Sequence, residues 1–295
     1  MKSISLAMIV VAAVAFLPIT QAGSDKPKNA QTAAASPMQG QGAGQVRDDN
    51  SLRTKIVWCP SGKFTMGNPE LENEFIIDND QVDVTLTTGF WLGQFEVTQS
   101  EWKKLMKTEP WKGQDKTKEG ADYPATFVSW NDAVDFCRKF TERERQAGRL
   151  PDRWEYTLPT QAQWEYACRA RTDTSFSFGD DKPKLRDYAW FSDNAWEVGE
   201  QYAHRVGQKK ANTWRIHDMH GNVWEWCRDV YSEELPGGCD PDVKPDERTW
   251  ASNRVSRGGS WISDAAECRS GYRIRGQPVS RLYSVGFRVA LCPVR

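Results

Sequence analysis

The chain has 295 residues, which is long enough for one large domain with a buried core or for two small ones. It carries 39 basic and 40 acidic residues, and this balance argues against a nucleic-acid binder or a polybasic membrane-surface protein. Fourteen Trp, eight Tyr and twelve Phe accompany only three His, and hydrophobic residues make up just 39%. Such a composition favours a loop-rich fold built on large aromatic rings over a helical bundle.

The N-terminus is typical of a secretory signal peptide. One basic residue precedes an apolar run from Ile4 to Ile19, and a small-residue site ends at Ala22. The run is short for a membrane span, and no Cys follows it to carry a lipid. We therefore expect a signal peptide over 1–22, cleavage after Ala22, no membrane span in the mature chain, and export to the periplasm or beyond. An uncleaved N-terminal anchor is the alternative.

Residues 23–52 are rich in Gly, Ala, Gln, Ser and Lys and predict a flexible linker. A single α+β domain with little regular secondary structure is expected over 53–295. Strands are predicted in "KIVWCPSGKFTMG" and "QVDVTLTTGFWLGQFEVTQ". After Arg171 regular patterns fade, and "RVSRGGSW" and "YSVGFRVALC" predict two closing strands.

Three helices are predicted between these strands, in "VTQSEWKKLM", "SWNDAVDFCRKFTERERQAG" and "LPTQAQWEYACRA". Their expected N-caps are Thr98, then Ser129 or Asn131, then Thr160. The apolar face of the second helix consists of Ala133, Val134, Phe136, Cys137 and Phe140, so Cys137 is expected in the core.

Seven cysteines are spread along the chain without a CxxC pair or zinc-type spacing. They are Cys59, Cys137, Cys168, Cys227, Cys239, Cys268 and Cys292. The odd count leaves at least one thiol unpaired. One or two disulfides together with buried free cysteines are expected, because export permits disulfides.

Several segments in order resemble one family. They are "GKFTMG", "FWLGQFEVTQSEW", "YPATFVSWNDAVDFC", "LPTQAQWEYACRA", "GNVWEWCRD", "RGGSW", "CRSGYR" and "GFRVA". Together they are similar to the formylglycine-generating enzyme, or sulfatase-modifying factor, family. The resemblance covers nearly all of the mature chain and implies a variant of the C-type lectin-like fold. The family includes copper-dependent oxidases of a sulfatase cysteine, other enzymes and ligand-binding proteins, so the fold alone does not define the activity.

The resemblance places the two copper-binding cysteines of the family in the loop after the glycine pair. The first position falls on Ser263, two residues after Trp261, and the second falls on Cys268. Cu(I) is soft and is held by paired thiolates, whereas a serine hydroxyl is hard and stays protonated. No histidine compensates, because Asp264 follows Ser263. Copper is therefore not expected as a cofactor, and copper-dependent oxidation is not expected as the activity.

Cys268 is then expected to be packed or disulfide-bonded. Its best partner is Cys227, which lies in the other motif that builds the centre of the family's fold. Cys59 and Cys292 are a second candidate pair, since the first and last strands would be neighbours if the domain closes on itself.

A structural calcium site is predicted in "HDMHGNVWEW". Asp218 and Glu225 are hard oxygen donors, and the turn between them can aim backbone carbonyls inward, as Ca²⁺ prefers. The resemblance implies the side chains of Asp218 and Glu225 and the carbonyls of Gly221 and Val223 as ligands; capped turn residues are the alternative. A second family site would begin at Asn194, although its acidic partner is not clearly aligned.

Two histidines, His217 and His220, flank Asp218. A transition-metal site there is conceivable, but two histidines within one turn are more often surface or supporting residues.

Two classes of function remain. The first is an enzyme with a remodelled pocket, whose candidate catalytic residues are Cys268, Ser263 and Ser260. Its expected pocket residues are Trp224, Trp261, Asp264, Glu267, Tyr272 and Arg273. Asp264 or Glu267 could act as an acid or base if desolvated, and solvated loop carboxylates are the alternative.

The second class is a non-enzymatic module that binds a protein, a small molecule or a glycan. Tyr272, Arg273, Arg275, Arg281 and Tyr283 suit anionic or glycan partners. Structural ties between loops are the alternative for the arginines, above all for Arg257, Arg269 and Arg288. We favour an exported, monomeric family member without the copper chemistry; an active formylglycine-generating oxidase is a further alternative.

Overall fold

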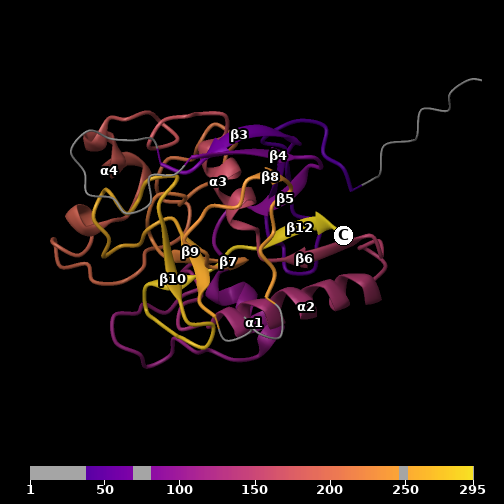
Figure 1. The fold of residues 1–295 in the computed structure, drawn as a ribbon. Helices are drawn as coiled ribbons and strands as arrows, with labels where there is room; N and C mark the ends of the chain where they lie inside the picture. The colour runs from indigo at the N-terminus through magenta and orange to yellow at the C-terminus, as the bar shows by residue number, and fades with distance from the viewer. Residues whose placement is uncertain (1–37, 69–80, 246–251, 295) are drawn as a thin grey trace, which may run out of the picture. The chain divides into compact units, whose positions relative to one another are not determined.

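The computed structural model describes residues 38–68, 81–245 and 252–294, and all structural statements refer to these ranges (Figure 1). The predicted signal peptide over 1–22 and the first part of the predicted linker lie outside the described residues. From Met38 onward the chain forms one unit. None of the helices in the described ranges is long and apolar enough to cross a lipid bilayer.

A five-stranded antiparallel sheet contains both ends of the described chain. Its order is β1 (Val46–Arg47), β2 (Ile56–Cys59), β5 (Phe90–Gly93), β12 (Ala290–Pro293) and β6 (Trp154–Thr157). The C-terminal strand β12 inserts between β5 and β6, which closes the domain (Figure 1). Every residue of β2 and β5 is buried, as expected for strands covered on both faces. Strands β1 and β6 were not predicted from the sequence.

Two smaller sheets complete the domain. One has the order β10 (Arg273–Gly276), β9 (Arg254–Arg257), β7 (Trp224–Val230) and β11 (Val285–Gly286), with β11 parallel to β7. The other has the order β3 (Gly62–Met66), β4 (Val82–Leu86) and β8 (Gly238–Cys239). The predicted strands correspond to β2, β3, β4, β5, β9 and β11–β12, while β7, β8 and β10 lie in the region where regular patterns fade.

The three main helices begin where the capping residues predict. They are α1 (Gln99–Met106), α2 (Trp130–Gln146) and α3 (Gln161–Arg169). Thr98, Ser129 and Thr160 each form a capping box with the residue three positions later, so Ser129 and not Asn131 caps α2. The remaining short helices are η1 (Lys182–Lys184), α4 (Leu185–Tyr188) and η2 (Ser192–Asn194).

On α2, Phe136, Cys137 and Phe140 are buried as predicted. Val134 was predicted on the same face but is 36% exposed, so that assignment is wrong. It borders a cavity described below.

The predicted linker is partly wrong, because the folded unit begins at Met38 and not at residue 53. Met38 is 4% exposed, and its carbonyl oxygen accepts a hydrogen bond of 2.7 Å from the indole of Trp91. Strand β1 then pairs with β2. These contacts depend on partners distant in sequence, and a Gly- and Gln-rich segment does not reveal them.

All seven cysteines lie in the described ranges and all are free. Both predicted disulfides are therefore wrong. Strand β5 separates β2 from β12, so Cys59 and Cys292 are not on neighbouring strands. Cys227 and Cys268 pack in two different apolar clusters.

Candidate functional site

The loop after β9 begins with a glycine pair that reverses the chain. Gly258 and Gly259 have φ angles of 101° and 77°, which L residues with a side chain rarely adopt. A Cβ atom on Gly259 would lie 2.6 Å from the sulfur of Cys268. The loop therefore folds back so that Cys268 packs directly against the glycine backbone.

Ser260 and Ser263, two of the candidate catalytic residues, face each other in this loop. Their hydroxyl oxygens are 3.4 Å apart, and both side chains are buried. The amide of Ser263 donates to the carbonyl of Ser260, and the amide of Ser192 donates to the carbonyl of Ser263. The loop therefore presents two hydroxyl groups side by side. Both are neutral at ordinary pH and can donate or accept hydrogen bonds.

Trp261 is fully buried, and its amide donates to the carbonyl of Asn222, which ties the loop to the turn before β7. Its ring lies 5.7 Å from that of Trp196 and 5.5 Å from that of Tyr283. The ammonium of Lys116 sits 4.4 Å from the Trp196 ring centroid and 5.1 Å from that of Tyr283. Trp261 thus belongs to an aromatic cluster with a cation over it, which sequence reasoning did not find.

Cys268 is buried, and Phe176, Leu185 and Phe191 belong to its apolar cluster. Burial raises the pKa of its thiol well above the usual value, and the nearby carboxylates raise it further. The thiol is therefore neutral and a poor nucleophile or metal ligand.

His220 holds the backbone of this cysteine. Its Nδ1–H donates to the carbonyl of Cys268 at 2.9 Å, and its Nε2 accepts from the amide of Ser177 at 3.1 Å. Burial lowers the pKa of His220 to about 4, which agrees with a neutral ring. His217 likewise donates from Nδ1 to the carbonyl of Lys209. The histidines thus act as supporting residues here.

The other predicted pocket residues are used mainly to hold the loop. Asp264 is exposed and accepts hydrogen bonds from the amides of Ala266 and Glu267, so its carboxylate caps a turn. The ring of Tyr272 lies 6.1 Å from that of Trp224. This arrangement does not supply the desolvated acid or base that an enzyme would need at Asp264.

Arg273 donates to the carbonyls of Ser232 and Glu233, both at 2.7 Å, and its guanidinium lies over the ring of Tyr231. Arg257 forms a buried ion pair of 2.9 Å with Glu165. These contacts confirm the structural alternative for Arg257 and extend it to Arg273.

The carboxylate of Glu225, on β7 opposite the last residue of β9, is fully buried. Glu225 accepts from Nε and Nη2 of Arg288 at 2.6 and 2.5 Å, and both side chains are 0% exposed. The indole of Trp164 also donates to Glu225 at 2.8 Å. The guanidinium of Arg288 therefore compensates the charge of Glu225.

Two further carboxylates, Asp218 and Glu96, have oxygens left over. Asp218 accepts from the amide of Gly207 with Oδ2, and Glu96 accepts from the side chain of Asn222 with Oε1. Within the described ranges Asp218 Oδ1 and Glu96 Oε2 are buried without a hydrogen-bond partner. Burial and the neighbouring charge of Asp218 raise the pKa of Glu96 well above its usual value. Sequence reasoning missed Glu96 because it lies 126 residues before Asn222.

Burial raises the pKa of Asp218 as well, so these carboxyl groups favour their neutral forms unless a cation offsets their charge. Oxygen donors of this kind suit a hard divalent cation. Across the part of the chain that the structure describes, no three His, Cys, Asp or Glu side chains form a ready-made metal centre. A cation at Asp218 and Glu96 would thus draw on backbone carbonyls, as the predicted Gly221 and Val223 ligands would provide.

The second predicted calcium site has no support. The side-chain oxygen of Asn194 accepts from the amide of Phe191, and its nitrogen donates to the carbonyl of Ala189, both at 2.9 Å. Asn194 therefore caps the turn in which it lies.

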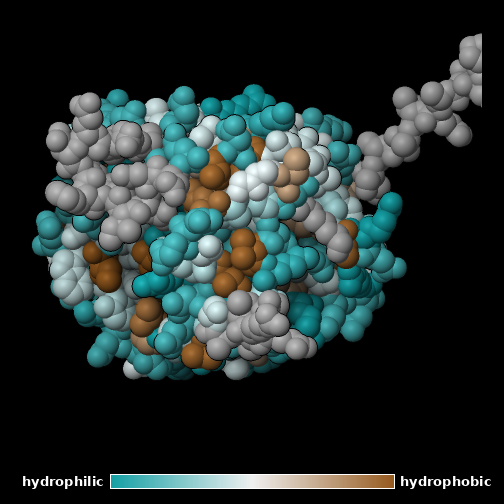
Figure 2. Space-filling model, viewed as in Figure 1, coloured by the Kyte–Doolittle hydropathy of each residue, from teal (hydrophilic) through white to brown (hydrophobic). Residues whose placement is uncertain are grey.

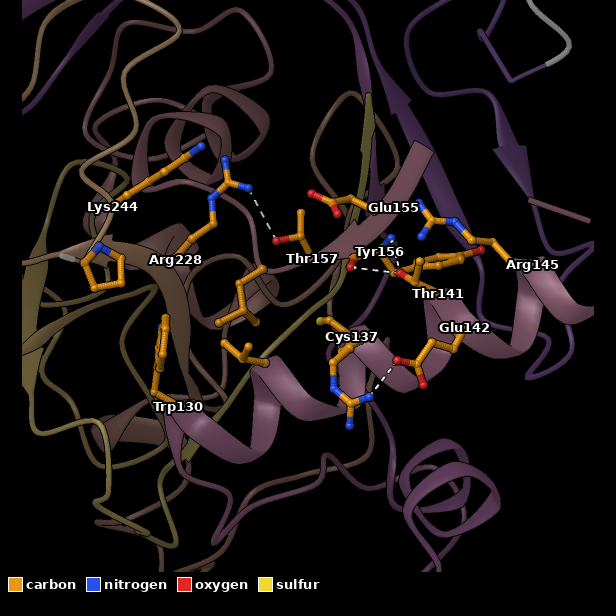
Figure 3. Close-up of a pocket in the computed structure, with 14 residues that line it drawn as sticks. Trp130, Cys137, Thr141, Glu142, Arg145, Glu155, Tyr156, Thr157, Arg228 and Lys244 are labelled. Carbon is orange, nitrogen blue, oxygen red and sulfur yellow. Dashed lines mark hydrogen bonds and ion pairs between the residues drawn. The ribbon is translucent and has the colours of Figure 1, made fainter. Parts of the chain in front are cut away.

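A cavity of about 520 Å³ opens between α2 and β6, away from every predicted site residue (Figure 3). Arg228 and Lys244 line one side, and Glu142 and Arg145 line the other (Figure 3). Arg228 is already paired with Asp242 at 2.8 Å, and Glu142 with Arg138 at 2.6 Å. On the face shown in Figure 2 the surface is mainly hydrophilic, with apolar areas in small separate groups.

Comparison with known proteins gives a consistent result. The family model for the sulfatase-modifying factor enzyme 1-like domain matches residues 43–292. A chaperone protein LppX of Paenibacillus barcinonensis is 30% identical, over 64% of this chain and 75% of the relative. The formylglycine-generating enzyme of Mus musculus is 27% identical, over 80% of this chain and 75% of the relative.

Among solved structures, PvdO from Pseudomonas aeruginosa superposes with a TM-score of 0.73 and 25% identity, covering 85% of this chain and 99% of that chain. The predicted fold class is confirmed: the domain is an α+β variant of the C-type lectin-like fold.

Proposed function

The chain belongs to the sulfatase-modifying factor enzyme 1-like domain family, and we propose that it is an exported member without copper-dependent cysteine oxidation. The observation that carries the proposal is Ser263 at the first copper-ligand position, with its hydroxyl directed to Ser260 at 3.4 Å. One buried neutral thiol, Cys268, and a serine oxygen do not fit the paired thiolates that hold Cu(I).

Relatives of this chain carry different names, one an enzyme and one a chaperone, so family membership leaves the activity open. A binding role on a lectin-like scaffold is the alternative to a remodelled enzyme. Two of the predicted recognition arginines form ion pairs, Arg275 with Glu233 at 3.0 Å and Arg281 with Asp132 at 2.7 Å. These pairs are exposed and screened by solvent, so they leave the guanidinium groups accessible to an anionic partner, whereas Trp261 is fully buried.

The mature protein is expected to form no aldehyde when it is incubated with Cu(I), O2 and a peptide that carries a sulfatase cysteine motif. The peptide mass is followed by mass spectrometry, with a copper-loaded formylglycine-generating enzyme as positive control. Cys268→Ala is expected to bind Cu(I) no more weakly than the unaltered protein, because a lone buried thiol contributes little affinity. Formation of formylglycine by this chain would restore the active oxidase as its function.

We also propose that Asp218 and Glu96 hold a structural Ca²⁺, together with the carbonyls of Gly221 and Val223. Glu225 is paired with Arg288 and lies close enough to raise the pKa of Glu96. The unpartnered buried oxygens of Asp218 and Glu96 support this assignment, because a buried unpaired carboxylate oxygen is costly without a cation or a hydrogen bond.

Chelation by EDTA is expected to lower the unfolding midpoint, and excess Ca²⁺ should restore it. An ion at one hundred times its dissociation constant stabilises a fold by about 2.7 kcal/mol, which corresponds to roughly 5–10 °C for a domain of this size. Differential scanning calorimetry of the protein and of Asp218→Asn measures this. A midpoint that EDTA leaves unchanged would contradict the site, as would an equal shift in Asp218→Asn.

A further inference from the structure

A second cavity of about 520 Å³ lies apart from the glycine-pair loop. It is lined by Tyr123, Trp190, Glu200, Tyr202, His204, Arg205, Gln208 and Lys209. None of these side chains was predicted as a site residue. Most of them come from the segment 200–209, which has no regular secondary structure. Tyr123 and Trp190 come from other parts of the chain, so the tertiary fold assembles this cavity.

Cations stand over the aromatic walls of the cavity. The Lys209 ammonium lies 3.9 Å from the centroid of the Trp190 ring, and the Arg205 guanidinium lies 5.3 Å from that of Tyr123. Stacking on a ring orients a cation without neutralising its charge. Lys209 also donates to the carbonyl of Arg186 at 2.7 Å, a contact that likewise leaves the charge in place.

The acidic groups nearby compensate these cations only in part. Glu200 is engaged by His204, with Oε2 and Nε2 2.7 Å apart. Asp122 faces Arg205 at 3.4 Å, but both side chains are more than half exposed, so solvent screens the pair. Burial costs the Lys209 ammonium part of its hydration and lowers its pKa, while the carboxylates of Asp187, Asp218 and Glu200 oppose this shift. An anion at Lys209 would restore that lost stabilisation.

The wall behind these cations is rigid. The ring of His204 stacks on Trp190 at 3.8 Å with an interplanar angle of 8°. The amide of His204 donates to the side chain of Asn222, and the amide of Gly207 donates to Asp218. Both acceptors are buried. A pocket whose groups are held in place before binding loses less entropy when a ligand enters.

We propose that this cavity binds a small organic anion that carries hydroxyl groups, of the class of a uronate or a sugar phosphate. Lys209 and Arg205 hold the carboxylate or phosphate. Glu200, Gln208 and the tyrosine hydroxyls pair with the hydroxyls of the ligand. The volume suits a ligand of this size. The site is independent of the proposed loss of copper chemistry, because none of its residues lies in the loop of Ser263.

The test is isothermal titration calorimetry with four probes: glucuronate, glucose 6-phosphate, glucose and inorganic phosphate. Glucuronate or glucose 6-phosphate is expected to bind at least about tenfold more tightly than glucose, because a charge-assisted hydrogen bond is worth more than 1.4 kcal/mol. The two acidic sugars distinguish a carboxylate from a phosphate as the preferred group. Inorganic phosphate alone is expected to bind more weakly than glucose 6-phosphate.

Lys209→Gln is expected to weaken the binding of the acidic sugar about tenfold, and Lys210→Gln is the matched control. Lys210 is the next residue and pairs with Asp187 outside the cavity, and its substitution removes the same charge. If Lys209→Gln does not fold, Arg205→Gln serves, since Arg205 is 53% exposed. Three results would each overturn the proposal: no binding of either acidic sugar, equal binding of glucose, or equal weakening by Lys210→Gln. Inorganic phosphate as tight as glucose 6-phosphate would overturn the assignment to a sugar.

Discussion

Replacing Arg288 with leucine is expected to lower the free energy of unfolding by about 3–5 kcal/mol, because it leaves the Glu225 carboxylate buried without its counter-charge. Both side chains are 0% exposed and share two hydrogen bonds. Arg288 also donates to the carbonyls of Gly93 and His217, so it ties β5 to the turn before β7. Urea unfolding followed by circular dichroism measures the change.

The control is Arg281→Leu, which removes an ion pair with Asp132 whose side chains are 51% and 27% exposed. An exposed pair of this kind is worth about 1 kcal/mol or less. The double variant Arg288→Leu with Glu225→Leu should recover part of the loss, since it removes both charges. Equal destabilisation by Arg288→Leu and Arg281→Leu would show that the buried pair is not what stabilises this region.

Gly259→Ala is expected to destabilise the domain by about 2–5 kcal/mol. A left-handed backbone costs an L residue roughly 1–2 kcal/mol, and overpacking adds about 1–3 kcal/mol. The second contribution arises because the new Cβ would lie 2.6 Å from the sulfur of Cys268. Thermal unfolding measures the loss.

Gly113→Ala separates the two contributions, because Gly113 has a φ of 70° but nothing lies within 4 Å of its Cβ position. It should show the backbone cost alone. Adding Cys268→Ala to Gly259→Ala should give a smaller loss than the sum of the two single changes. If Gly259→Ala costs no more than Gly113→Ala, Cys268 is free to move and its packed role is rejected.

The two variants address different parts of the proposal. Arg288→Leu probes the buried ion pair with Glu225, next to the proposed calcium site. Gly259→Ala probes the packing of Cys268, which is the reason that its thiol stays neutral. If both variants destabilise the domain as expected, the buried ion pair and the packing of Cys268 on Gly259 both hold the loop in which Ser263 faces Ser260.

Much of the local structure could be predicted from the sequence. The N-caps Thr98, Ser129 and Thr160 were found because a capping box involves residues only three positions apart. Strands β2, β4 and β5 followed from β-branched and aromatic runs. The loop that follows the glycine pair was likewise recognised, since its residues form one short motif.

Partners distant in sequence could not be predicted in this way. The predicted disulfides failed because only the strand order shows that β5 separates Cys59 from Cys292. The first residues of the domain were assigned to a linker because the local sequence does not reveal their partners. Met38, for example, contacts Trp91, which comes 53 residues later.

The sequence by itself determined the family, the helix starts and the loop in which a serine occupies a copper-ligand position, because these depend on short motifs in a fixed order. Only the tertiary structure decided which charges meet. It brings Glu96 to the same buried network as Asp218, pairs Glu225 with Arg288, and sets Lys209 over Trp190. Burial and long-range packing set the energies of these groups, and neither can be read from residues that are neighbours along the chain.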